Sequence, residues 1–255
     1  MRIPVTLLFL SFLYIGQAQD RLFTYTYQSN VLNAGQQEIE VWNTMLSGKA
    51  DYYRKLAHRL EFETGLGHKL QTAFYLNLDQ SFNGPVDLGF SNEWKWKLTD
   101  PVANAVGLAL YGELGIESGE TELEGKILLD KQTGRFLHAI NLVVEEEWGK
   151  ITVGPKTETE KATIGDLHYA LSFRINSGFN IGFESMLRNA WSSGNREFTT
   201  LFAGPCISLA NENFWINATF LPQLSSLYSV DDTSNGLDLT HHTKNEIRII
   251  FSFEL

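Results

Sequence analysis

The sequence alternates bulky apolar residues with small or polar residues along most of its length. From Val102 to Glu117, for example, the even positions are apolar except Asn104 and Gly112, whereas the odd positions are small, charged or tyrosine. Successive side chains of a β-strand point to opposite faces, so such segments predict strands with one apolar face and one polar or crowded face. We find no helical stripe longer than two turns, and the sequence therefore predicts an all-β chain.

Gly, Asn, Asp and Pro divide the alternating segments, as expected for turns. The segments number about 12, with about 10 to 14 strands allowed by uncertain boundaries. Predicted strands cover residues 37–46, 54–64, 68–78, 86–98, 102–117, 121–130, 135–148, 163–175, 178–189, 196–209, 213–221 and 245–255. Residues 149–162 and 222–243 are expected to be the longest loops. No shift in composition divides the chain, so one domain is predicted.

The N-terminus has the order of a secretory signal peptide. Arg2 supplies a positive charge, residues 5–15 are largely apolar, and small residues surround Ala18. We expect cleavage after residue 18, leaving residues 19–255 as the mature domain. The apolar run is too short for a membrane-spanning helix, which needs about 20 residues. No later apolar stretch is long enough either, which excludes a helical membrane protein.

Charge and cysteine content exclude further classes. The net charge of −10 argues against a nucleic-acid partner, because such proteins carry basic patches that neutralise phosphates. Cys206 is the only cysteine, so the chain can form neither an internal disulfide nor a cysteine metal cluster. We expect no cofactor.

Alternation alone fits a soluble β-sandwich as well as a membrane barrel. Small residues on the polar face favour the barrel, because a narrow lumen leaves little room for side chains. These residues are Ala103, Ala105, Gly107, Ala109 and Gly115, with Gly89, Ser91, Gly178 and Gly182 in other segments. Aromatic residues near strand ends are expected to form interfacial girdles. They are Trp42, Tyr52, Tyr53, Trp94, Trp96, Trp148, Trp191 and Trp215.

The alternation continues through residues 247–255 to the last residue. This segment resembles the C-terminal assembly signal of bacterial outer-membrane proteins, although it ends in Leu255 instead of Phe or Trp. We therefore expect recognition by the barrel assembly machinery through residues 247–255. In lipid every backbone N–H and C=O must pair, which a sheet achieves by closing on itself. The prediction is one antiparallel up-and-down barrel in outer-membrane lipid, with an even strand count and periplasmic termini.

A family resemblance lies near the start of the mature chain. Arg21–Tyr27, Val31-Leu32, Gly35, Glu38, Glu40 and Trp42 resemble the opening of a family of uncharacterised outer-membrane β-barrels of Gram-negative bacteria. That family is loosely grouped with outer-membrane transporter-like barrels. The resemblance is clearest over residues 21–42. It implies the fold and the location, and it brings no catalytic residues.

Charged residues that alternate with apolar ones are predicted to line the lumen. They are Arg59, Glu61, Glu63, Glu93, Lys95, Glu113, Glu145, Arg174, Glu184, Glu246 and Arg248. Their mixed signs could pair across strands and seal a narrow barrel. Alternatively they could line a thin pore, which the excess of carboxylates would make favourable to cations.

Catalysis and metal binding are not expected. No hydrolase elbow, phosphate loop or zinc helix occurs. His168 and Ser172 share the predicted lumen face, but about 13 Å of strand separates them, too far for a hydrogen bond. In the last loop, His241 and His242 with Asp231, Asp232 and Asp238 could hold a metal, although a solvated polar loop is the favoured interpretation. His58 and His138 fall on apolar faces, where interfacial positions are expected.

Three functional hypotheses stay open. The first is a small channel or transporter for an unidentified solute, with an acidic lumen that favours cations. The second is a sealed structural or binding barrel that acts through its extracellular loops. The third is an exported soluble β-sandwich that binds a ligand. We expect no enzymatic activity under any of the three.

Overall fold

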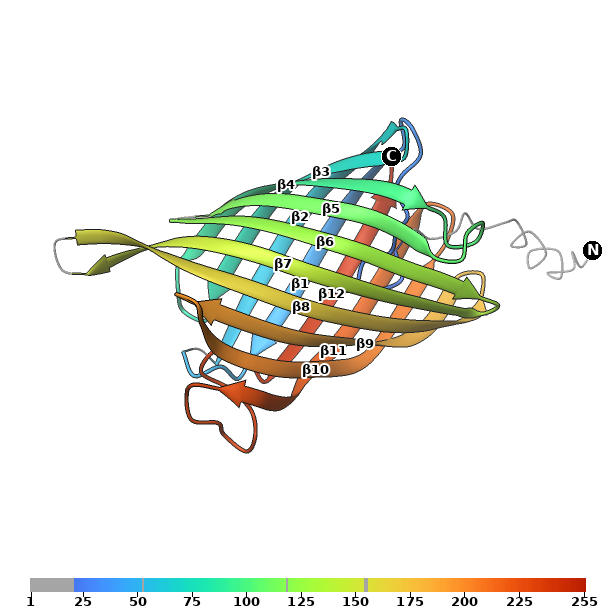
Figure 1. The fold of residues 1–255 in the computed structure, drawn as a ribbon. Helices are drawn as coiled ribbons and strands as arrows, with labels where there is room; N and C mark the ends of the chain where they lie inside the picture. The colour runs from blue at the N-terminus through green and yellow to red at the C-terminus, as the bar shows by residue number, and fades with distance from the viewer. Residues whose placement is uncertain (1–20, 52, 118, 154–155) are drawn as a thin grey trace, which may run out of the picture.

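The computed structural model shows a closed barrel of twelve antiparallel strands (Figure 1). The structure describes residues 21–51, 53–117, 119–153 and 156–255, without the side chains of residues 151–158. The predicted signal peptide, residues 1–18, lies outside these residues. No helix within the described residues is long and apolar enough to cross a membrane.

Each strand pairs with its neighbours in the sequence, and the first pairs with the last to close the barrel. The strands are β1 Gln37–Ser47, β2 Arg54–Gly67, β3 Leu70–Ser81, β4 Val86–Thr99, β5 Gly107–Glu117, β6 Glu120–Thr133, β7 Phe136–Val153, β8 Lys156–Asn176, β9 Phe179–Ser192, β10 Asn195–Ala210, β11 Phe214–Ser229 and β12 Asn245–Glu254. The predicted all-β up-and-down barrel of about 12 strands is thereby confirmed.

The barrel has an apolar outer face and a polar interior. In β5, Leu110 and Leu114 are exposed, whereas the alternating Ala109 and Glu113 are buried. On β2 and β4, Glu61 and Glu93 are fully buried in the interior. A soluble β-protein places its polar face in water, so this inside-out arrangement is that of a barrel in lipid.

The two rims of the barrel differ, and we name them by position. The terminal end carries the C-terminus and short turns, such as those at residues 68–69 and 134–135 (Figure 1). The distal end carries the β7–β8 hairpin, which projects beyond the other strands, and the loop at residues 230–244 between β11 and β12.

Strand β5 begins at Gly107, so the strand predicted from residue 102 was placed too early. Residues 101–106 form a turn instead. The Asp100 carboxylate accepts hydrogen bonds from the backbone amides of Val102 and Ala103, at 2.9 and 3.0 Å. A side chain that caps successive amides competes with strand pairing. Consequently Ala103 and Ala105 are exposed in the turn and do not line the lumen.

The two long predicted loops were also drawn too long. β7 extends to Val153 and β8 starts at Lys156, so strand pairing continues through most of residues 149–162. Similarly, β11 continues past Pro222 to Ser229 while it pairs with β10. Both extensions carry polar or charged residues. Such a composition predicts a loop when only the sequence is known, but it is compatible with a strand that extends beyond the apolar band.

The prediction of an interfacial girdle was wrong for two tryptophans. Trp42 and Trp215 are buried inside the barrel, where Trp42 lies on the same face of β1 as Glu38 and Glu40. By contrast, Trp94 and Trp96 lie on the outer face of β4 and are about half exposed. The alternation itself placed Trp42 on the polar face, whereas the expectation of a girdle relied on closeness to a strand end.

Candidate functional site in the barrel lumen

The N-terminal segment, residues 21–33, lies inside the barrel and fills the half of the lumen near the terminal end. Phe23, Thr24 and Ser29 are fully buried, although no residue of this segment belongs to a strand. Phe23 packs against Leu137, Ala139, Ala170 and Cys206. The small residues of the wall therefore make room for a segment of the chain itself.

Glu184 of β9 is the main anchor of the N-terminal segment. Its carboxylate accepts hydrogen bonds from the backbone amides of Thr24, Tyr25 and Thr26 at 2.9, 2.8 and 2.7 Å. The hydroxyl groups of Thr24 and Thr219 also donate to it, at 3.2 and 2.6 Å. Successive backbone amides that converge on one anion form a favourable, oriented binding site.

Other wall side chains satisfy the backbone farther along the segment. Asn141 accepts from the Tyr27 amide at 2.6 Å and donates to the Tyr27 carbonyl at 2.8 Å. Asp130 accepts from the amide and the hydroxyl of Ser29 at 3.0 and 2.7 Å. Gln71 accepts from the Leu32 amide at 2.8 Å. A buried segment without strand partners needs such contacts, because unpaired backbone groups are costly.

Beyond the N-terminal segment lies a cavity of about 300 Å³, which we call the vestibule. Tyr25 and Tyr27 of the segment border it, and its wall includes residues close to the distal end such as Asp79 and Glu117. Seven carboxylates and four permanent cations line it. The carboxylates are Asp79, Glu113, Glu117, Glu122, Glu124, Asp166 and Glu246, and the cations are Arg59, Lys126, Arg188 and Arg248.

Ion pairs and aromatic contacts hold the vestibule cations against the wall. Lys126 lies 2.8 Å from Glu124, and Arg188 lies 3.4 Å from Asp166. The guanidinium of Arg248 lies over the Tyr25 ring, at 4.0 Å from its centroid. Each cation has a partner and carboxyl groups outnumber the cations, so the formal charge of the vestibule is negative.

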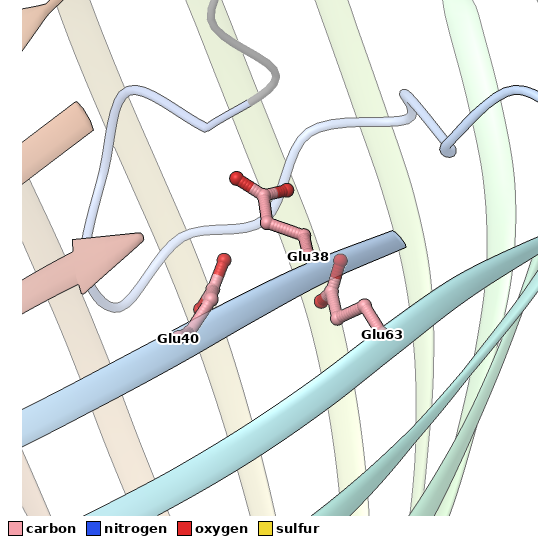
Figure 2. A group of neighbouring side chains, drawn as sticks. All are labelled: Glu38, Glu40 and Glu63. Carbon is pink, nitrogen blue, oxygen red and sulfur yellow. The ribbon is translucent and has the colours of Figure 1, made fainter. Parts of the chain in front are cut away.

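On the other side of the segment, acidic residues from β1 and β2 gather against it. Glu38, Glu40 and Glu63 point to the same side of these strands, and one oxygen of each lies within 4.8 Å of the others (Figure 2). Glu38 stands opposite Glu63 in the strand pairing, and Glu40 opposite Glu61. We call these four residues the acidic cluster. Arg21 forms an ion pair with it, 3.8 Å from Glu40.

The predicted lumen residues occupy three places. Arg59, Glu113, Glu246 and Arg248 line the vestibule, and Glu145 pairs with Arg188 at 3.7 Å. Glu61 and Glu63 belong to the acidic cluster, and Lys95 lines the small cavity beside it. Glu93 is buried on β4, which β3 separates from the cluster, and it accepts a hydrogen bond from the Tyr75 hydroxyl. Glu184 holds the N-terminal segment. Arg174 is the exception, since it lies at the terminal rim with an exposed side chain.

The histidines of the last loop are tied to acidic side chains. Nδ1 of His241 lies 2.9 Å from Asp238, and its Nε2 lies 3.5 Å from Asp231. Despite partial burial, hydrogen bonds from the His241 backbone and ring lower the pKa of Asp238. Burial, reinforced by the charge of Arg188, lowers the pKa of His242 to about 3. Among the described residues, three or more possible ligand atoms converge only in the acidic cluster, and the loop therefore offers no comparable metal geometry.

Sequence reasoning missed the occupant of the lumen. Gln71, Asp130 and Asn141 were not singled out, and residues 21–33 were used only for a family resemblance. Gly107 is the residue that could have indicated a filled lumen, because an added Cβ there would meet the side chains of Ser29 and Asp130. His168 and Ser172 both face the interior as expected, and the His168 ring contacts the Tyr25 carbonyl at 3.2 Å.

Solved structures share the fold. The NanC porin is 14% identical, with a TM-score of 0.57 over 85% of this chain and 100% of that chain. The KdgM porin in complex with disordered oligogalacturonate is 10% identical, with a TM-score of 0.54 over 86% and 99%. The β domain of the Bordetella autotransporter BrkA is 10% identical, with a TM-score of 0.55 over 88% and 100%. At these identities the likeness shows the fold alone.

No curated protein matches the sequence. One protein family does, and its match runs through the whole barrel, from residue 15 to residue 255. This agrees with the resemblance seen at residues 21–42, which implied a family of outer-membrane barrels. The chain belongs to the family described as "Family of unknown function (DUF6662)".

Proposed function

We propose that this protein is a porin-type channel of the bacterial outer membrane for small polar solutes. The N-terminal segment closes the channel and must move for solutes to pass. The exposed apolar band and the barrel shared with two porins support a membrane location. With the terminal end in the periplasm, the distal hairpins and loop 230–244 face outward, as is usual for outer-membrane barrels.

The observation that carries the proposal is the way the N-terminal segment is held. Polar groups line the wall on both sides of it, in the vestibule and in the acidic cluster. The segment contacts the wall through side chains such as Glu184, Asn141 and Asp130, without sharing strand hydrogen bonds. It can therefore leave without opening the sheet to lipid, and a continuous polar path would remain.

The charge of the path supports a preference for cations. Carboxylates outnumber permanent cations seven to four around the vestibule. A narrow passage with one sign in excess repels solutes of that sign. The oligogalacturonate held by the KdgM porin is a polyanionic sugar, and we expect such a ligand to be disfavoured here.

Planar-bilayer recording tests the proposal. The full chain should insert and show openings with cations more permeant than anions, and removal of residues 22–32 should make these openings longer. Glu113→Gln together with Asp166→Asn should lower the cation-to-anion permeability ratio, because both carboxylates line the vestibule and each lies beside an arginine that favours its charged form. Leu110→Ile on the outer face, which leaves the charge and the lumen unchanged, is the control. Insertion without current in the full chain and in the shortened chain would contradict a channel.

A second function has a specific observation behind it. The vestibule has room for a small molecule while the N-terminal segment fills the lumen beneath it. A sealed barrel that binds a ligand from outside would have the same arrangement. This alternative would be supported if neither the full chain nor the shortened chain conducted current in the bilayer, and if an added ligand protected vestibule residues from chemical labelling.

A further inference from the structure

We propose that the acidic cluster binds one calcium ion, with carboxylate oxygens of Glu38, Glu40 and Glu63 as ligands. The selected oxygens of these three residues lie within 4.8 Å of one another (Figure 2). Such oxygens have a common centre at most about 2.8 Å from each, so an inward shift of a few tenths of an ångström brings all three to the Ca–O distance of about 2.3–2.6 Å. Calcium prefers oxygen ligands and accepts irregular geometry, which suits carboxylates from two adjacent strands.

A cavity of about 20 Å³ lies at the cluster, between β1, β2 and the N-terminal segment. All three carboxylate residues line it, together with Gln28 and Asn30 of the segment. One small ion or water needs roughly 10–15 Å³, so the space accommodates a single ion. The side-chain oxygens of Gln28 and Asn30 already accept from the Leu22 amide at 2.7 Å and from Lys97 at 3.4 Å, so water would complete the coordination of the ion.

Neutral donors orient the three carboxylates and favour their charged forms. The indole of Trp215 donates to Glu38 at 2.6 Å, and that of Trp42 donates to Glu40 at 2.7 Å. The Gln71 amide donates to Glu63 at 2.8 Å. Hydrogen bonds to a carboxylate stabilise its ionised form but contribute no positive charge. Carboxylates gathered this closely repel one another when they are ionised, and a bound cation would relieve that repulsion.

Glu61, the member of the acidic cluster that is not a proposed ligand, supplies a second observation. Its side chain is fully buried opposite Glu40, and within the described part of the chain neither of its carboxylate oxygens has a hydrogen-bond partner. It lies on the same face of β2 as Glu63, and the pairing with Glu40 places it beside the three proposed ligands. A buried carboxylate without a partner is costly, and a bound cation would remove that cost.

The protein's own cations do not replace the ion. Arg21 lies 3.8 Å from Glu40, longer than the usual 2.7–2.9 Å of a charge-assisted hydrogen bond. Its guanidinium donates instead to the carbonyls of Phe23 and Thr24, and it stacks over Trp42 at 4.3 Å. Lys95 lines the cavity, with its ammonium 5.8 Å from the centre of the Tyr27 ring.

Calcium binding to the folded full-length barrel in detergent tests the proposal. Equilibrium dialysis should give one bound ion per chain at about 1 mM calcium, the range of weak extracellular sites. Terbium should show emission sensitised by tryptophan, because the Trp42 and Trp215 indoles contact the ligands, and calcium should displace it. Glu38→Gln and Glu63→Gln should each weaken binding at least about tenfold.

Glu122→Gln is the matched control, since it makes the same substitution in the vestibule. Heat-modifiable gel mobility verifies that each variant is folded. If neither cluster variant folds, the melting temperature of the wild-type barrel tests the proposal instead. Calcium should raise that temperature, and magnesium should raise it less. No bound calcium, equal loss in the Glu122 variant, or a preference for magnesium would overturn the proposal.

Discussion

Replacement of Glu184 by glutamine should release the N-terminal segment from the lumen. One carboxylate oxygen accepts from the amides of Tyr25 and Thr26, and the other accepts from the Thr24 amide and two hydroxyls. If the glutamine oxygen keeps the first pair of bonds, its NH₂ group faces the Thr24 amide. The hydroxyls of Thr24 and Thr219 can reorient to accept a hydrogen bond, whereas the backbone amide cannot.

The size of the effect follows from these contacts. One unsatisfied buried amide costs about 1–3 kcal/mol, and two remaining bonds each lose about 1 kcal/mol when their acceptor becomes neutral. The docked state should thus be destabilised by about 3–5 kcal/mol. At about 1.4 kcal/mol per tenfold, the population of the released state rises roughly 100-fold to a few thousand-fold.

Cys206 reports the release without further engineering. It is the only cysteine, it is 4% exposed, and it packs in one cluster with Phe23 of the segment. Its maleimide labelling rate should rise with the released population in Glu184→Gln. Glu145→Gln is the control, because it makes the same substitution at a residue paired with Arg188 of the wall. Equal labelling rates in the wild type and both variants would refute the role assigned to Glu184.

Three further predictions concern other parts of the barrel. The pKa of His242 is lowered to about 3 from 6.5, so its contribution to loop stability is complete above about pH 6.5 and falls as the pH drops towards 3. Proteolysis of residues 230–244 should accordingly increase at acidic pH, and His242→Phe should reduce that increase. Gly107→Ala should crowd the Ser29 contact and speed Cys206 labelling roughly tenfold, because overpacking costs about 1–3 kcal/mol; an unchanged rate would contradict this. Leu114→Arg should destabilise folding into lipid by about 2–4 kcal/mol, measured by denaturant titration in vesicles.

The sequence predicted the wall of the barrel because alternation is a local property. Each strand must present one face to lipid, so residues such as Leu110 and Glu113 reveal their faces within a few positions. The same rule placed Glu61 and Glu184 in the interior, where the structure has them. Strand ends were harder to predict, because the polar extensions of β7 and β8 leave the apolar band and lose the contrast between faces.

The contents of the lumen could not be predicted in this way. Alternation tells which side chains face inward but not what they meet there, and that depends on contacts between distant parts of the chain. Thr24 and Glu184, for example, are 160 residues apart. Residues 21–33 form no strand in the structure, where side chains of the wall, not a neighbouring strand, satisfy their backbone. The small Gly107 on the inner face is compatible with a filled lumen, because Ser29 and Asp130 occupy the space beside it.

The way in which the N-terminal segment is held is compatible with its proposed release from the lumen. A strand that left the barrel would expose unpaired backbone groups to lipid, at several kcal/mol for each group. When the N-terminal segment leaves, the groups it exposes lie in a polar lumen that water can enter. Each of its hydrogen bonds is then exchanged for one with water. The net loss is about 0.5–1.5 kcal/mol for each bond, instead of the full desolvation cost of the bonded groups. Release of such a segment would leave every strand of the barrel paired, whereas release of a strand would not.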